Sequence, residues 1–160
     1  MKHIDETRFG FLITDVGRLV GKLFDQRARH VLSLTRAQCR VLAYLALYGR
    51  INQASLAELL EITPIALARL LDRMAEGGWI ERHPDPADRR AYRLVLTQKA
   101  EQSLEQALAV GDAVRDEALA GLTPSEQQQL ITLLLRVRDN LSVKLADSEP
   151  VPVTHLKVAG

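Results

Sequence analysis

Two helix-start signals that lie close together constrain the fold of this chain more than any other feature. Asn52 is the expected N-cap of a short helix over residues 52–60, and Thr63 followed by Pro64 is the expected start of a second helix over residues 63–76. Only a few residues separate the two segments. This spacing predicts two helices joined by a tight turn, as in a helix-turn-helix.

A β-hairpin is predicted directly after this helix pair. Gly77 and Gly78 permit the left-handed conformation that ends a helix. Residues 79–83 and 91–96 then alternate between apolar and polar side chains, as half-buried strands do. The sequence between them, PDPADRR, is polar and rich in proline, which predicts an exposed hairpin tip. A helix pair followed by such a hairpin is the layout of a winged helix-turn-helix.

Longer helices are predicted on both sides of this region. Apolar residues recur at helical spacing in residues 9–30, 35–48, 97–119 and 123–145. Two of these helices have strong start signals, Thr35 with Gln38 and Thr123 with Glu126, which are the residue pairs of a capping box. We therefore expect a mainly α fold with a small β-hairpin.

The terminal helices are predicted to form a homodimer. Residues 9–30 and 123–145 carry apolar faces that are too wide for one small winged domain to cover. A second copy would bury these faces, whereas in the monomeric alternative the two helices cover only each other. We accordingly divide the chain into a dimerisation region (1–34 and 97–146), a winged helix-turn-helix domain (35–96) and a tail predicted to be disordered (147–160).

The charge of the chain limits how it can bind nucleic acid. The net charge is only +1 over 160 residues, whereas a protein that coats nucleic acid without specificity is usually strongly basic. Residues 1–50 hold nine Lys and Arg against four Asp and Glu, and residues 97–160 hold six against nine. If the chain binds DNA, it therefore uses a few placed arginines rather than bulk charge.

No motif supports another class of function. The four histidines are scattered along the chain, and no glycine-rich phosphate loop, nucleophile elbow or paired carboxylate motif is present. We therefore expect no enzymatic activity, no metal and no cofactor. No apolar run approaches the roughly 18 residues that span a membrane, and Cys39 is the only cysteine. These observations predict a cytoplasmic protein without a membrane partner.

The second helix of the pair has two distinct faces. Its core face follows the i, i+3, i+4, i+7 pattern of Leu67, Leu70, Leu71 and Met74. The residues expected to contact DNA lie away from that face and are Thr63, Pro64, Ala66, Arg69 and Arg73. Arg69 is the long donor that can reach guanine O6 and N7 or a phosphate. For this helix alone, two solvated arginines on an amphipathic helix explain the pattern equally well.

The hairpin tip favours DNA binding. Four arginines flank it, Arg82, Arg89, Arg90 and Arg93. Asp88 lies two residues before Arg90, and an arginine held by a neighbouring carboxylate can enter the narrow, electronegative minor groove. A charged turn exposed to solvent is the simpler explanation of the tip by itself. Taken with the helix pair, DNA binding explains both features.

These residues resemble the MarR family of bacterial regulators over about residues 9–145. The motifs that carry the resemblance include Leu56-Ala57, Arg69-Leu70-Leu71-Asp72-Arg73-Met74, Gly78-Trp79-Ile80-Glu81-Arg82 and Asp85-Pro86-Ala87-Asp88-Arg89-Arg90. The segments that most resemble its SlyA branch are Arg89-Arg90-Ala91, Leu96-Thr97, Lys99-Ala100-Glu101 and Gln129-Leu130-Ile131-Thr132-Leu133.

The resemblance implies a homodimer bound to an inverted-repeat operator in double-stranded DNA, and we interpret the protein as a repressor. It implies that the recognition helix, with Arg69 and Arg73, lies in the major groove. It also implies that Arg90 of the wing enters the minor groove and that Asp88 orients it. The alternative from another class is a dimeric winged-helix module for protein interaction that does not bind DNA. The retained arginines argue against that alternative.

The resemblance also implies a small-molecule effector. The family commonly releases DNA when a small aromatic or phenolic anion binds between the dimerisation helices and the winged domain. This chain has Ala37, Cys39 and Ala43 where some relatives carry larger aromatic or imidazole side chains, so the sequence assigns no effector-binding residues. Cys39 lies inside a predicted helix and is expected to be a small core residue rather than a redox sensor.

Overall fold

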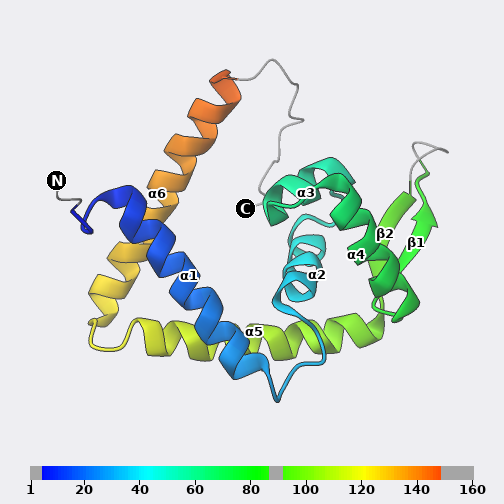
Figure 1. Ribbon diagram of the computed structural model, residues 1–160, viewed down its shortest axis with the longest axis horizontal. Helices are drawn as coiled ribbons and strands as arrows, with labels where there is room; N and C mark the ends of the chain where they lie inside the picture. The colour runs from blue at the N-terminus through cyan, green and yellow to red at the C-terminus, as the bar shows by residue number, and fades with distance from the viewer. Residues whose placement is uncertain (1–4, 87–91, 149–160) are drawn as a thin grey trace. The chain divides into compact units, whose positions relative to one another are not determined.

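The computed structural model describes residues 5–86 and 92–148. Its elements in chain order are α1 (Phe9–Ala28), α2 (Arg36–Tyr48), α3 (Gln53–Leu60), α4 (Pro64–Glu76), β1 (Ile80–Pro84), β2 (Tyr92–Leu96), α5 (Gln98–Ala118) and α6 (Pro124–Ser148) (Figure 1). This order confirms the predicted fold class, mainly α with one small hairpin. The chain divides into two compact units, Met1–Ala118 and Leu119–Gly160.

The helices α2, α3 and α4 begin where the capping residues predict. Thr35 and Gln38 form a capping box, in which the Gln38 N–H donates to Thr35 Oγ1 (3.3 Å) and the Thr35 N–H donates to the Gln38 side chain (2.8 Å). Asn52 caps α3 and Thr63 caps α4, each by accepting a hydrogen bond from the backbone N–H three residues further on.

The turn between α3 and α4 depends on a left-handed residue. Glu61 has a φ of 56°, and it is the one non-glycine residue with a positive φ in the part of the chain that the structure describes. Its N–H donates to the Glu58 carbonyl, and the Ile62 N–H donates to the Ala57 carbonyl (3.1 Å). These bonds satisfy the end of α3 and let the chain turn directly into α4.

The main apolar core of the described residues joins α2, the helix-turn-helix, its hairpin and α5. The largest fully buried side chains come from α2, α3, α4 and β1, and they are Val41, Leu42, Leu56, Leu67, Leu71, Met74 and Ile80. The predicted core face of α4 is confirmed, because all four of its residues are buried. Burying one such side chain contributes about 1.5–3 kcal/mol, so this cluster fixes the position of α4.

The hairpin is a two-stranded antiparallel sheet in which Ile80 pairs with Leu96 and Pro84 pairs with Tyr92. β1 begins at Ile80, one residue later than the alternating pattern predicts. The Trp79 N–H donates to the Met74 carbonyl (2.9 Å), so Trp79 completes the end of α4 instead of starting the strand.

α1 packs against α5 within the first unit. A small cluster of Ala28, Val110 and Val114 lies between them. Arg27 also donates two hydrogen bonds to the carboxylate of Glu117, at 2.7 and 2.5 Å. The N-terminal part of α1 nevertheless exposes a set of large apolar side chains, Phe9, Phe11, Leu12, Ile13, Val16, Leu19 and Val20.

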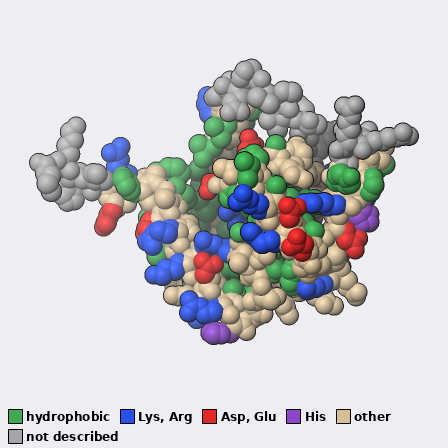
Figure 2. All heavy atoms as spheres, turned by 45° about the vertical axis from the view of Figure 1, so that its right-hand side comes forward, with side chains coloured by type: hydrophobic (Ala, Val, Ile, Leu, Met, Phe, Trp, Pro, Cys, Tyr) green, Lys and Arg blue, Asp and Glu red, His purple; other side chains and the backbone are tan. Residues whose placement is uncertain are grey.

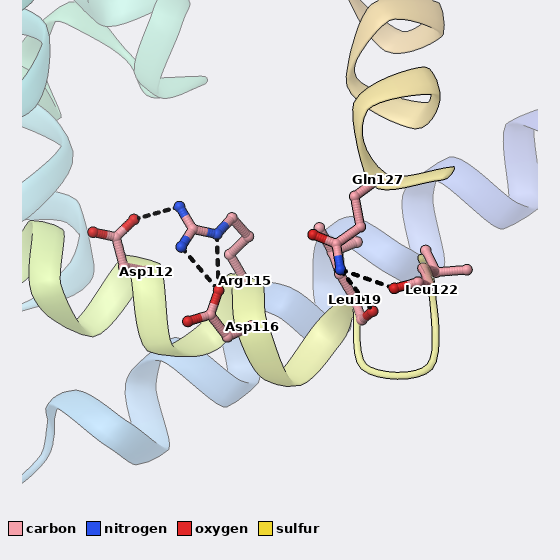
Figure 3. A network of polar contacts seen from close by, with 6 residues as sticks. All are labelled: Asp112, Arg115, Asp116, Leu119, Leu122 and Gln127. Atoms are coloured by element: carbon pink, nitrogen blue, oxygen red, sulfur yellow. Dashed lines mark hydrogen bonds and ion pairs between the residues drawn. The ribbon is translucent and has the colours of Figure 1, made fainter. Parts of the chain in front are cut away.

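α6 and the turn before it form the second unit. The Thr123–Glu126 capping box is present, and the Gln127 amide donates to the carbonyls of Leu119 and Leu122 (Figure 3). The helix continues to Ser148, slightly beyond its predicted end. Its large apolar side chains are exposed, namely Leu130, Ile131, Leu133, Leu134, Leu135, Leu141, Val143 and Leu145.

Candidate nucleic-acid interface

The outer face of α4 carries both arginines that the sequence assigns to the recognition helix. Arg69 and Arg73 are exposed, and neither has a side-chain partner among the described residues. Each lies one position before one core residue and two positions after another, Arg69 between Leu67 and Leu70 and Arg73 between Leu71 and Met74, and therefore points away from the core that holds the helix. Two rigidly placed cations without partners can contact the bases or phosphates of a nucleic acid.

The N-terminal end of α4 is small and apolar. Pro64 and Ala66 are exposed, as predicted. Thr63 is exposed too, but its hydroxyl accepts the Ala66 N–H (3.2 Å), so its main role is to cap the helix. Ile65, which the sequence analysis did not single out, is 69% exposed between them. Its position outside the core pattern of α4 is the signal that could have identified it.

One arginine near the predicted wing is bound to α4. Arg82 of β1 donates to the carboxylate of Asp72 (2.5 Å), and both side chains are partly exposed. The sequence places Arg82 beside the tip arginines, and its pairing with Asp72, ten residues earlier, leaves no local sequence signal. The contact links the base of the hairpin to α4 and neutralises the charge of Asp72 on the outer face of the helix.

The predicted wing residues Asp88, Arg89 and Arg90 lie outside the described residues. Their roles therefore stay predictions. On the face shown in Figure 2, basic and acidic side chains alternate and form no continuous basic surface. This distribution fits the expectation that a few placed arginines carry any binding to DNA.

A hollow of about 510 Å³ lies between α1 and α2. Four cations line it, Arg18, Lys22, Arg36 and Arg40, against the single acidic residue Asp25. Arg36 Nε lies 3.7 Å from Asp25 Oδ1. Arg18 is paired with Asp15, so Lys22 and Arg40 carry the remaining positive charge, which suits a small anion.

Arg40 also contacts the helix-turn-helix. Its Nη2 donates to the carbonyl of Leu59 (2.5 Å) in the last turn of α3, and its guanidinium lies 5.7 Å from the centre of the Tyr44 ring. One side chain therefore lines the hollow and caps the helix that precedes the turn into α4.

Cys39 is a core residue, as predicted. It is 6% exposed and packs in the main apolar cluster. Burial raises the pKa of its thiol, so the unreactive protonated form predominates near neutral pH.

Acidic residues of α5 form ion pairs on its exposed surface. Arg115 binds both Asp112 and Asp116 (Figure 3), and Glu117 binds Arg27. Within residues 5–86 and 92–148, no group of three His, Cys, Asp or Glu side chains is placed to hold a metal ion. None of the helices described is both long and apolar enough to cross a membrane.

Comparison with known proteins identifies the family. The model of the MarR family matches residues 32–91. Wild-type MarR from E. coli in its apo form is 31% identical, and the match covers 85% of this chain and 98% of that one with a TM-score of 0.72. A cysteine-to-serine mutant of the same protein, complexed with operator DNA, is also 31% identical, with a TM-score of 0.69 and coverage of 82% and 94%.

A third structure shares the fold at lower identity. BpsR from Bordetella bronchiseptica, whose DNA binding is regulated by 6-hydroxynicotinic acid, is 22% identical with a TM-score of 0.72, and the match covers 87% of this chain and 99% of that one. The identity of 31% over nearly all of the E. coli protein is sufficient to assign a family. This chain belongs to the MarR family of winged-helix transcription regulators.

Proposed function

We propose that this protein is a repressor that binds an inverted-repeat DNA operator as a homodimer and is released by a small aromatic anion. The observation that carries DNA binding is the outer face of α4, with Arg69 and Arg73 exposed and without side-chain partners among the described residues. The E. coli relative in complex with operator DNA supports the same ligand here. We also propose the SlyA branch, from the motifs described above, and a cytoplasmic location.

In this proposal, α4 and the wing contact different grooves of DNA. α4 enters the major groove, where Arg69 donates to guanine O6 and N7 or to a phosphate and Arg73 binds the backbone. The wing lies over the adjacent minor groove. There Arg90 is inserted between the phosphate strands, Asp88 orients it, and Arg89 contacts a phosphate.

The test of DNA binding compares three arginine variants. Arg69→Ala should weaken binding to the operator by about 1–3 kcal/mol and relax sequence discrimination, and Arg73→Ala should weaken binding to all sequences. The control is Arg29→Ala, which removes the same charge from an exposed position after α1. Fluorescence anisotropy on operator and scrambled duplexes measures both effects. Equal affinity of the wild type for the two duplexes would contradict the proposal.

The wing is tested separately. Arg90→Ala should weaken binding by about 1–3 kcal/mol and reduce the slope of log affinity against log salt by about one. Asp88→Ala removes an acid near DNA and by charge alone would tighten binding. If Asp88 orients Arg90, binding instead weakens or stays level, and the double variant is no worse than Arg90→Ala. Wild-type behaviour of Arg90→Ala would reduce the tip to a solvated turn.

The hollow between α1 and α2 is the proposed effector site. Arg18 and Arg36 are paired with Asp15 and Asp25, which leaves Lys22 and Arg40 as its unneutralised cations, and the hollow lies between the first helix and the winged domain. The regulation of BpsR by 6-hydroxynicotinic acid supports an aromatic carboxylate as the ligand class. We expect 6-hydroxynicotinate to release operator DNA, and 6-hydroxynicotinamide, which lacks the charge, to do so far less. Equal effects of the two compounds would exclude an anion site.

A further inference from the structure

Ile65 is an apolar side chain exposed on the helix that is proposed to read DNA. It is 69% exposed in the first turn of α4. Between residues 35 and 86, the one other large hydrophobic side chain that is so exposed is Leu47 of α2, at 70%. A single exposed hydrophobic residue is common on protein surfaces, so exposure alone assigns no role to Ile65.

The surroundings of Ile65 give it a role. It lies one turn before Arg69, so both side chains project from the same side of α4. Its neighbours at this end of the helix are Pro64 and Ala66, which offer no hydrogen-bonding side chain, and the Thr63 hydroxyl already accepts a backbone N–H. The N-terminal end of α4 is therefore an apolar surface placed before an arginine.

The C-terminal half of the same face is unsuited to enter the groove. It carries Asp72, which is paired with Arg82, and Glu76, which is exposed. The exposed carboxylate of Glu76 is repelled by phosphates, so the N-terminal half, with Ile65 and Arg69, is the part that can approach the bases. This is also the end that recognition helices insert into the major groove.

The major groove presents one apolar group, the C5-methyl group of thymine. We propose that Ile65 determines specificity by packing against a thymine methyl group in each operator half-site. This inference rests on the proposed function and adds to it a reader for thymine beside the arginine that reads guanine or phosphate. A polar base edge at this position would lose its water without gaining a hydrogen bond, and thymine is therefore favoured.

The experiment removes the methyl group and nothing else. An operator is first selected from a random duplex library with the wild-type protein, and each thymine is then replaced singly by deoxyuridine. Anisotropy titrations should show one thymine per half-site whose replacement weakens wild-type binding about fourfold, the effect of exposing one methyl group. Ile65→Ala should bind the operator more weakly and should be insensitive to deoxyuridine at that position.

Two further variants sharpen the result. Leu47→Ala removes a hydrophobic side chain of equal exposure from α2 and should keep the full deoxyuridine effect. Ile65→Val shortens the side chain by one carbon and should reduce the effect without abolishing it. It therefore reports on the contact even if Ile65→Ala binds too weakly to measure.

The failures of the two proposals are distinguishable. If the selection enriches no sequence, the proposed function is wrong. If an operator is found but has no thymine in its half-site, if no deoxyuridine substitution matters, or if Ile65→Ala keeps the same sensitivity as the wild type, specific DNA binding stands and the role of Ile65 is overturned.

Discussion

At the scale of single residues, Gly21 controls whether an arginine can occupy the hollow between α1 and α2. Arg36, from the start of α2, lies so close across Gly21 that a Cβ there would overlap its guanidinium group. The overlapping atoms are the far end of a flexible side chain, which can move aside at little cost. A glycine inside a helix lowers stability by about 0.5–1 kcal/mol relative to alanine, so its presence here fits a steric need of Arg36.

We predict that Gly21→Ala separates stability from effector response. The melting temperature should stay level or rise, because alanine favours the helix. Release of operator DNA by 6-hydroxynicotinate should require about tenfold more ligand, because the displaced Arg36 no longer offers a charge-assisted hydrogen bond. Gly10→Ala is the control, since a Cβ at Gly10 meets nothing within 4 Å. An unchanged response in Gly21→Ala would remove Arg36 from the effector site.

Cys39 provides a prediction about pH and oxidation. Because burial raises the pKa of its thiol, the folded protein holds this proton more tightly than the unfolded chain does. The resulting stabilisation is complete below the pKa of the unfolded thiol, about 8.5, and decreases as the pH rises from there through the folded-state pKa.

Urea unfolding should therefore show that wild-type stability falls more steeply above pH 8.5 than the stability of Cys39→Ser, because a serine at position 39 does not titrate. Peroxide should leave the operator affinity of both proteins unchanged. Release of the wild type alone by peroxide would make the buried thiol a sensor.

At the scale of secondary structure elements, α1 and α5 are joined by the Arg27–Glu117 ion pair. The hydrogen bond from Arg27 lowers the pKa of the Glu117 carboxyl. The pair therefore stabilises the fold above the pKa of an unfolded glutamate, about 4.3, and this stabilisation is lost as the pH falls through the lower, folded-state value.

Glu117→Gln should destabilise the protein slightly at pH 7, because both side chains are largely exposed and screened. The difference from the wild type should shrink in urea unfolding experiments as the pH falls below the pKa of an unfolded glutamate and Glu117 becomes protonated. Glu105→Gln, at an exposed position of the same helix, is the control. A difference that does not change with pH would mean that Glu117 acts through packing rather than charge.

The elements could be predicted from the sequence because their signals are local. Thr35, Asn52 and Thr63 bond to backbone groups three residues away, and the core face of α4 follows from its own periodicity. Contacts between distant segments could not be predicted. One example is the ion pair of Arg82 with Asp72, which ties an arginine of the hairpin to α4. Another is the hydrogen bond from Arg40 to the carbonyl of Leu59.

At the scale of the whole molecule, we predict that two copies of the chain form a homodimer. The apolar faces of α1 and α6 become buried between the two copies. Sedimentation equilibrium at micromolar concentration should give twice the chain mass, with stability that rises with concentration. Leu12→Glu places a charge in the exposed face of α1 and should yield monomers that bind a full inverted repeat no better than a half-site. Leu47→Glu, at an even more exposed position but on α2, should remain dimeric. A wild-type monomer would remove the basis for a two-fold operator.

Thr97 closes the base of the hairpin and has a consequence for how such a molecule can diverge. Its hydroxyl donates to the Gly78 carbonyl (2.8 Å) and accepts the Ala100 N–H (3.2 Å), and its own N–H donates to the Trp79 carbonyl (3.2 Å). The end of α4 and the start of α5 are thus joined at one residue, independently of the segment between β1 and β2. Insertions, deletions or transplanted sequences in that segment should therefore leave the two helices in register. Under the proposed mode of DNA binding, the contacts of the wing can then diverge while those of α4 are inherited unchanged.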